Sequence, residues 1–139
     1  MIKALAHVCI LSSDLDRTLD FYCGTLELRR KFDFVEGEEL IGFYLEVGRN
    51  QFIEVFKDRS GNEAGPQDKR IKHFCLEVED IDAARDRLLS KGIAVTDKKK
   101  GNDASWQIWC KDPDGIDVEF HQYNPDSSQV TGARCHVNR

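Results

Sequence analysis

Four residues of this sequence carry side chains that bind metal ions in proteins, and they lie at related spacings. His7 and His73 offer imidazole nitrogens, whereas Glu54 and Glu119 offer carboxylate oxygens. His73 follows His7 by 66 residues, and Glu119 follows Glu54 by 65. Mixed nitrogen and oxygen ligands suit divalent ions such as Zn, Ni, Fe, Co and Mn. The residue types and their spacing therefore predict one metal site built from two equivalent pairs.

Each of these residues, taken singly, has a simpler interpretation. A histidine on a strand is more often hydrogen-bonded or at the surface than bound to a metal, and a glutamate on a strand is usually solvated. The repetition of the same residue types at equivalent positions favours the metal site, because a pseudo-twofold arrangement would bring the two pairs together.

An internal repeat underlies the spacing. The segment HVCILSSDLD from His7 recurs as HFCLEVEDID from His73, and the same offset pairs Cys9 with Cys75. The segment FIEVF around Glu54 corresponds to DVEFH around Glu119 after a slip of one residue, which a change in a hairpin turn would explain. The chain is therefore predicted to contain two copies of one structural unit.

Each copy is predicted to be a strand, a helix and three further strands. Asp14 or Asp16 caps the first helix, which runs to about Cys23, with Gly24 as its C-cap, and Gly92 ends the second. A polar linker joins the copies, Asp-Pro-Asp-Gly forms a turn, and the residues after Pro125 form a loose tail. The expected strands are 5–11, 28–35, 40–47, 51–56, 72–78, 94–97, 106–111 and 116–123; the second helix is 81–91, the linker 58–69 and the turn 112–115.

Alternation along these strands places the ionisable side chains on one face. Glu54 stands opposite Ile53 and Val55, and Glu119 stands opposite Val118 and Phe120. The apolar face is the natural bed for the helix of each copy. Burying the other face is costly unless its groups are hydrated, paired or bound to a metal. The residues expected on that face are His7, Cys9, Glu54, His73, Cys75, Glu77, Asp117, Glu119 and His121.

The composition of the chain argues against some classes of binding partner. The chain has 139 residues, of which 40% are hydrophobic and 32% charged, and its net charge is −5. This charge does not favour nucleic acid or an anionic membrane, and no apolar stretch is long enough to cross a bilayer. The five cysteines form no CxxC pair, and the N-terminus lacks a secretory signal pattern. We therefore expect free thiols and a cytoplasmic protein.

The sequence resembles the vicinal oxygen chelate superfamily, and within it the glyoxalase I type, over roughly residues 3–123. The resemblance rests on DLDRTLDFY at 14–22, on Phe52-Ile53-Glu54, on Lys72-His73, and on Asp-Pro-Asp-Gly at 112–115 followed by Val118-Glu119. It implies an α+β fold in which two tandem βαβββ modules form a curled sheet. The implied single domain is 1–125, with modules at 1–60 and 70–125, followed by a polar tail at 126–139.

The resemblance also implies a site and an activity. Its four metal-ligand positions fall on His7, Glu54, His73 and Glu119. Glu119 is the expected catalytic base, and Glu54 is its expected catalytic partner as well as a ligand. The implied protein is a homodimeric, metal-dependent lyase or isomerase that acts on a small vicinal-oxygen substrate such as a hemithioacetal. Zn or Ni is the expected ion, and Fe, Co or Mn are alternatives.

Other members of the superfamily remain alternatives. Extradiol dioxygenases and thiol transferases acting on fosfomycin need no ligand at the position of Glu54, and methylmalonyl-CoA epimerases place Gln there. A binding or resistance protein without turnover is a further possibility. The glyoxalase I pattern has an Arg and an Asn that contact glutathione. This chain has Leu11 and Asp58 at those positions. The acidic Asp58 would repel a glutathione carboxylate.

Several other residues are weaker candidates for the site. Asp117, His121 and Tyr123 lie close in sequence to Glu119, and His121 is expected either to contact substrate, to orient a ligand, or to be a solvent-facing histidine. Four aromatic residues are candidates for lining a substrate pocket, with ordinary core or rim packing as the alternative: Phe43, Tyr44, Trp106 and Trp109.

Overall fold

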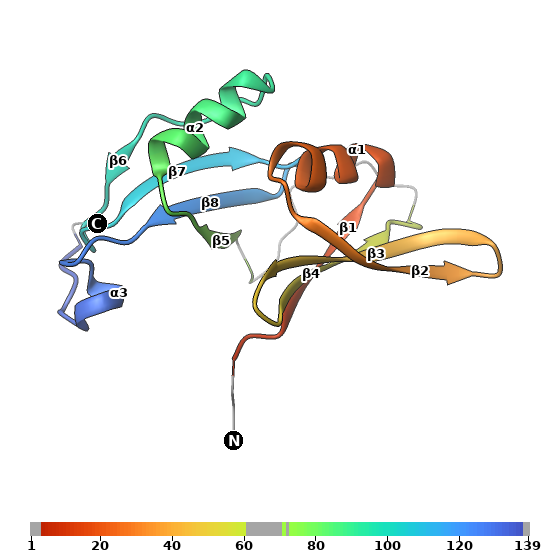
Figure 1. The fold of residues 1–139 in the computed structure, drawn as a ribbon, viewed down its shortest axis with the longest axis horizontal. Coiled ribbons are helices and arrows are strands. Elements are labelled where there is room, and N and C mark those ends of the chain that lie inside the picture. The colour runs from red at the N-terminus through yellow and green to blue at the C-terminus, as the bar shows by residue number, and fades with distance from the viewer. Residues whose placement is uncertain (1–3, 61–70, 72, 138–139) are drawn as a thin grey trace. The chain divides into compact units, whose positions relative to one another are not determined.

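The protein consists of two compact units that repeat one order of elements. A computed structural model describes residues 4–60, 71 and 73–137. The units are Met1–Gln67 and Asp68–Arg139, and each contains a strand, a helical segment and three further strands (Figure 1). The expected α+β fold of two tandem βαβββ modules is confirmed.

The first unit is a four-stranded mixed sheet with one helical segment. The strand order is β1-β4-β3-β2, with β1 parallel to β4 and the other pairs antiparallel. A short π-helix, η1, continues directly from α1. The elements are β1 (His7–Ser12), α1 (Leu15–Leu19), η1 (Asp20–Thr25), β2 (Arg29–Glu36), β3 (Glu39–Gly48) and β4 (Gln51–Lys57).

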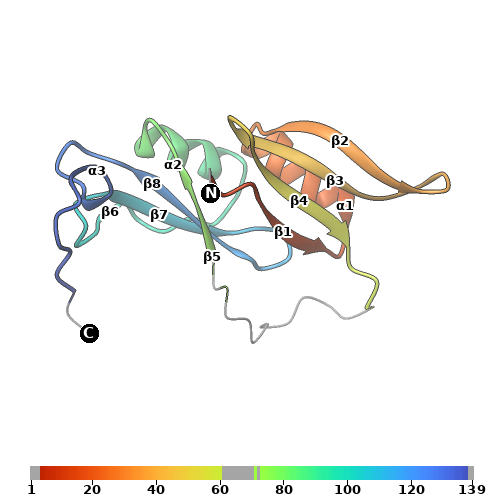
Figure 2. The ribbon, with the colours of Figure 1, turned by 90° about the horizontal axis from the view of Figure 1, so that it is seen from below.

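The second unit repeats this topology. Its strand order is β5-β8-β7-β6, again with the first and last strands of the unit parallel and adjacent. Figure 1 shows β8 between β5 and β7, and Figure 2 shows β4 between β1 and β3. The elements are β5 (His73–Glu77), α2 (Ile81–Ser90), β6 (Lys99–Lys100), β7 (Trp106–Lys111), β8 (Asp117–Gln122) and α3 (Ser128–Thr131).

Equivalent aspartates begin the helix of each unit. The Asp14 carboxylate accepts hydrogen bonds from the backbone N–H groups of Asp16 and Arg17. Asp80 does the same for Asp82 and Ala83. These side chains satisfy donors that the first turn of a helix leaves unpaired. Asp14, one of the two caps that the sequence allows, is therefore the one used.

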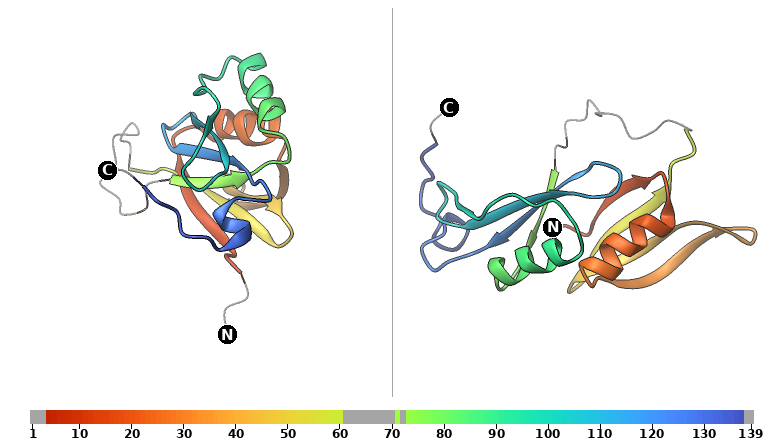
Figure 3. Two further views of the ribbon diagram at one scale, coloured as in Figure 1. Left: turned by 90° about the vertical axis from the view of Figure 1, so that its left-hand side faces the viewer. Right: turned by 90° about the horizontal axis from the view of Figure 1, so that it is seen from above.

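Each helix covers one face of its own sheet, and the core of the unit lies between them (Figure 3). In β4, Ile53 and Val55 are buried in that core while Glu54 points to the other face. The expected alternation is thus present, and it leaves the ionisable face of each sheet uncovered by that unit's helix. The buried hydrophobic side chains are Ile10, Phe21, Tyr22, Phe43, Leu45, Ile53, Val55, Ile81, Leu88, Ile108, Cys110, Val118 and Phe120.

The structure differs from the predicted elements in two places, and a third prediction falls mostly outside the described residues. Gly24 lies inside η1 rather than at a helix end, and the left-handed residue that follows is Glu27, at φ 62°. The strand expected at 94–97 is only an isolated bridge at Val95, and the two-residue β6 lies further along the chain. The expected linker at 58–69 falls mostly on residues 61–70, outside the described residues.

The polar tail is more ordered than expected. It contains α3, and the buried Ser127 just before this helix accepts a hydrogen bond from the backbone N–H of Asn124. The Ser105 hydroxyl lies within hydrogen-bond distance of Oγ of Ser127, at 3.1 Å, and of Oε1 of Gln129, at 3.0 Å, and this anchors the segment to the loop before β7. Among the described residues, no helix is long and apolar enough to span a membrane.

Candidate metal centre

The first unit brings His7 and Glu54 together on the uncovered face of its sheet. They lie on the adjacent parallel strands β1 and β4, where His7 is opposite Phe52 and Glu54 is opposite Cys9. This diagonal placement brings Nε2 of His7 to 3.9 Å from Oε1 of Glu54. Both side chains are partly open to solvent, with 40% and 20% of their surface exposed.

Tyr44 fixes the other nitrogen of His7. It lies on β3 directly opposite Glu54, and its hydroxyl is 2.8 Å from Nδ1 of His7. The two rings also make an edge contact at 5.6 Å between centroids. A metal-binding imidazole commonly has its second nitrogen held by a hydrogen bond, which sets the tautomer and the ring orientation. Tyr44 therefore leaves Nε2 of His7 directed towards Glu54.

The second unit brings His73 and Glu119 together in the same way. Glu119 is opposite Cys75 across β5 and β8, and Nε2 of His73 lies 3.2 Å from Oε2 of Glu119. Trp109 takes the place of Tyr44, opposite Glu119 on β7, and its ring meets the His73 ring edge-on at 4.7 Å. Its indole N–H donates to Gln107 rather than to the histidine. Each unit thus has an aromatic ring against its histidine, but only Tyr44 of these two residues also forms a hydrogen bond with it.

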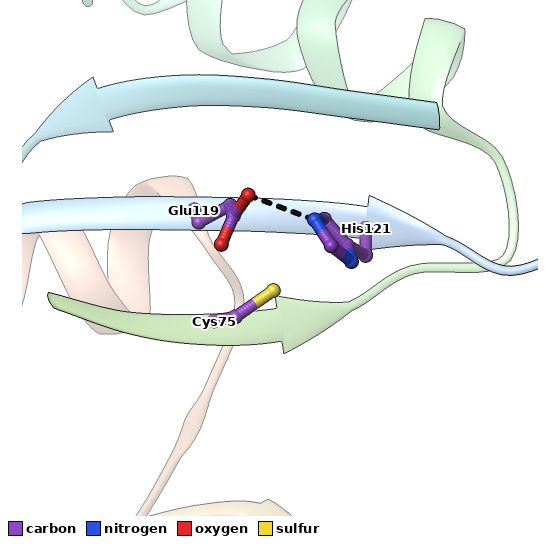
Figure 4. Close-up of side chains that lie close together, drawn as sticks. All are labelled: Cys75, Glu119 and His121. Atoms are coloured by element: carbon purple, nitrogen blue, oxygen red, sulfur yellow. Dashed lines mark hydrogen bonds and ion pairs between the residues drawn. The ribbon is translucent and has the colours of Figure 1, made fainter. Parts of the chain in front are cut away.

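His121 joins Glu119 from the same strand. Its Nε2 lies 2.8 Å from Oε1 of Glu119, the oxygen that does not face His73 (Figure 4). Only 8% of each of these two residues is exposed, so the bond is well shielded from water. Of the alternatives expected for His121, the solvent-facing one is therefore wrong, and the side chain lies against a proposed ligand.

Cys75 completes the cluster around Glu119. Its thiol points from β5 towards Glu119 and His121, and ligand atoms of the three residues all lie within 4.8 Å of one another (Figure 4). Although the residue as a whole is exposed, burial of the sulfur and the negative charge of Glu119 raise the pKa of the thiol to about 12. The thiol therefore stays protonated at neutral pH unless a cation displaces the proton.

Both histidine–glutamate pairs offer donor types that suit a divalent metal ion, and the spacing of the second pair also fits one. With metal–ligand bonds of roughly 2.1 Å, neighbouring ligand atoms lie roughly 3.0–3.4 Å apart. The 3.2 Å separation of His73 and Glu119 falls in this range, and the 3.9 Å separation of His7 and Glu54 is somewhat longer. The donors are imidazole nitrogen and carboxylate oxygen, which suit a divalent transition metal. Each pair lies within one unit.

The structure gives each of the remaining candidate residues a separate environment. Phe43 is fully buried in the core, so only its packing interpretation holds, and Asp117 forms a surface ion pair with Lys111. Trp106 lies under the ammonium group of Lys98, at 4.5 Å from the ring centre. Tyr123 stays near the site through an edge contact with His121. Cys75 was noted in the sequence only as a residue of the ligand face, and its direct opposition to Glu119 depends on the strand register.

The sequence is similar to known proteins over most of its length. The sequence model of the Glyoxalase/Bleomycin resistance protein/Dioxygenase superfamily matches residues 4–120. A probable lactoylglutathione lyase from Synechocystis is 32% identical over an alignment of 126 positions, which covers 85% of this chain and 94% of the relative. The glutathione transferase FosA from Serratia marcescens is 26% identical, over 87% of this chain and 82% of the relative.

A solved structure shows the same fold. The crystal structure of a glyoxalase family protein from Enterococcus faecalis superposes with a TM-score of 0.73 at 24% identity, over 86% of this chain and 97% of that one. At this identity the likeness concerns the fold alone. It agrees with the two βαβββ units described above.

Proposed function

This chain belongs to the glyoxalase/bleomycin resistance protein/dioxygenase superfamily, and from that premise we propose that it is a metal-dependent lyase or isomerase of the glyoxalase I type. Its substrate is a small molecule with two neighbouring oxygen atoms, such as a hemithioacetal. One observation carries the proposal: each unit holds a histidine–glutamate pair at equivalent positions of its first and last strands.

The proposed ligands of one divalent ion are His7, Glu54, His73 and Glu119. The chemistry that such an ion supplies is Lewis-acid stabilisation of negative charge on a substrate oxygen when a neighbouring carbon loses its proton. Zn or Ni is the proposed ion, because imidazole and carboxylate suit both. Cys75 would have to lose a proton that its surroundings hold firmly, so the thiol is the weaker ligand candidate.

Glu119 is the proposed base. Its carboxylate takes a proton from one substrate carbon and returns it to the adjacent carbon, so the reaction is an isomerisation that needs no oxidant or reductant. Glu119 is better shielded from water than Glu54, with side-chain exposures of 10% and 20%. This shielding limits loss of the abstracted proton to solvent. Glu54 then serves mainly as a ligand and as the partner of Glu119.

The thiol part of the substrate need not be glutathione. Leu11 is an exposed residue on β1, and Asp58 is a half-buried residue just after β4. Neither offers the cationic or amide contact that the glyoxalase I resemblance implies at these positions. A negative charge at Asp58 disfavours the carboxylates of glutathione. A small neutral thiol adduct is therefore the proposed substrate class.

The resemblance also underlies two further proposals. The protein is a homodimer, as expected for two-module chains that bury their sites at a twofold interface. Light scattering after gel filtration should give about twice the monomer mass of 15.9 kDa. The second proposal is a cytoplasmic location. In the part of the chain that the structure describes, no disulfide links the five cysteines, which is in keeping with a reducing compartment, and localisation of the tagged protein would test the proposal.

The deciding experiment measures metal content and turnover in the same preparation. Elemental analysis of the purified protein should find about one ion per chain. Isomerisation of methylglyoxal hemithioacetals should be lost after chelation and should return with Zn or Ni. A fully metal-loaded protein that turns over no hemithioacetal would exclude the lyase activity while leaving the metal site in place.

The second candidate is thiol transfer, and the relation to the glutathione transferase FosA favours it. Its signature is consumption of thiol with formation of a stable thioether, whereas an isomerase returns the free thiol after product hydrolysis. Mass spectrometry of the products distinguishes the two reactions.

A further inference from the structure

The repeat breaks at His121. Two residues after Glu54 the chain has Phe56, and two residues after Glu119 it has His121. Phe56 stacks on Phe34 at 4.6 Å, so its environment is aromatic. His121 instead contacts the carboxylate of Glu119 at 2.8 Å. The two units therefore share the histidine–glutamate pair but differ in what holds the glutamate.

The direction of this hydrogen bond follows from the surroundings of His121. An ionised carboxylate only accepts hydrogen bonds, so Nε2 of His121 must carry the proton and donate it. Nδ1 of His121 is buried, and the described residues offer it no hydrogen-bond partner. A bare ring nitrogen tolerates this better than an N–H group, because a buried donor without an acceptor is costly. The neutral tautomer with its proton on Nε2 satisfies both conditions.

The two oxygens of Glu119 consequently have separate roles. Oε1 is held by His121, and Oε2 faces Nε2 of His73 at 3.2 Å. The second of these is the oxygen–nitrogen pair assigned above to the metal ion. With Oε1 anchored, the carboxylate cannot rotate freely, and Oε2 stays directed towards His73.

We infer that His121 is a positioning residue that donates a hydrogen bond to Glu119 and thereby raises the metal affinity of the second unit. The inference rests on the proposed function for the identity of the ligands. The hydrogen bond itself does not depend on the metal. Loss of a partner that orients a metal ligand typically weakens metal binding by about 10–100-fold.

The test compares three variants by metal affinity, measured in competition with a chromophoric chelator. His121→Phe copies the residue of the first unit and removes the donor, so we expect its dissociation constant for Zn to rise about 10–100-fold. His121→Gln places an amide N–H near the position of Nε2 and should recover most of the affinity. His136→Gln is the matched control, because it removes an exposed histidine of the tail and should bind Zn as the wild type does. Melting of each metal-free variant checks that the fold is intact.

The outcomes are distinct. His121→Phe with wild-type affinity would overturn the inference. Equal loss in His121→Phe and His121→Gln, together with loss in Cys75→Ser, would mean that His121 and Cys75 are themselves ligands, which also overturns it. Cobalt substitution reports the second case directly, since a thiolate ligand adds a sulfur-to-metal charge-transfer band.

A measurement without metal separates this inference from the proposed function. Nitrogen-15 NMR of the metal-free protein should show the proton of His121 on Nε2, and the signal should shift in Glu119→Gln. A proton on Nδ1 would overturn the inference even if the enzyme is active. Wild-type protein that binds no metal would instead sink the proposed metal site, while the tautomer would still decide whether His121 holds Glu119.

Discussion

The hydroxyl of Tyr44 lies 2.8 Å from Nδ1 of His7, whereas Trp109, at the equivalent position of the second unit, donates its N–H to Gln107. An aromatic ring thus contacts the histidine in both units. Of these two aromatic residues, Tyr44 forms a hydrogen bond with its histidine and Trp109 does not. The two proposed half-sites therefore depend on different neighbours, Tyr44 in one and His121 in the other.

Tyr44→Phe should weaken metal binding without loosening the fold. The change keeps the ring that contacts His7 and removes only the hydroxyl that holds Nδ1. We expect the dissociation constant for Zn to rise roughly 10-fold, the lower end of the range for such partners. Chelator competition measures it, and His136→Gln, which changes an exposed residue of the tail, is a suitable control. An unchanged affinity would mean that Tyr44 contributes only its ring contact with His7 and that the hydrogen bond does not affect metal binding.

Replacement of each glutamate by glutamine should separate ligand from base. Glu119→Gln removes the proposed base and should lower kcat by about 10²–10⁴-fold, the usual range for general base catalysis. Glu54→Gln keeps a ligand oxygen and should affect metal affinity more than the turnover of the metal-saturated enzyme. Steady-state kinetics at saturating Zn tests both variants. Equal losses of kcat would show that Glu119 has no special role in proton transfer.

Cys75 should react slowly with alkylating agents until the pH is high. Burial of the thiol and the charge of Glu119 raise its pKa to about 12, so at pH 8 only about one thiol in ten thousand is ionised. The rate of iodoacetamide labelling at Cys75, followed by peptide mass spectrometry, should still be rising at pH 10. In Glu119→Gln a negative charge that opposes ionisation is lost, so the pKa should fall and labelling should accelerate. Rapid labelling of the wild type at pH 8 would contradict this environment.

Asp58→Asn should improve the use of glutathione. Asp58 is half-buried near the surface, and removal of one unfavourable charge interaction there is worth about 1 kcal/mol. We therefore expect kcat/KM for the glutathione adduct to rise by up to about fivefold. The value for an uncharged thiol adduct should stay constant and serves as the internal control. A rise for both adducts would point to a general effect on the fold.

The sequence was sufficient to predict the architecture, because it contains two copies of one repeat. The recurrence of HVC at His7 and HFC at His73 identified two copies, and alternation around Glu54 and Glu119 identified the uncovered face. Gly92 was correctly placed beyond the end of α2, and its φ of 74° is the conformation that favours glycine. Such local signals determine single elements without help from the rest of the chain.

The parts that were missed depend on contacts distant in sequence. The π-helix after Leu19 and the order of α3 have no periodic signature, since the second is anchored by Ser105 and Asp103, more than 20 residues away. The roles of Tyr44 and His121 depend on strand register and on rotamers, which spacing alone does not give. Whether a histidine next to a proposed ligand faces water or the ligand is decided only by packing.

The difference between Phe56 and His121 has a consequence for how the two copies of the repeat can change. Phe56 packs against an aromatic ring, whereas His121 holds a carboxylate, so the two positions are not interchangeable. An exchange of the two residues would place an imidazole against an aromatic ring in the first unit and remove the partner of Glu119 in the second. Each copy is therefore bound to its own residue at this position, although the strands around it are equivalent.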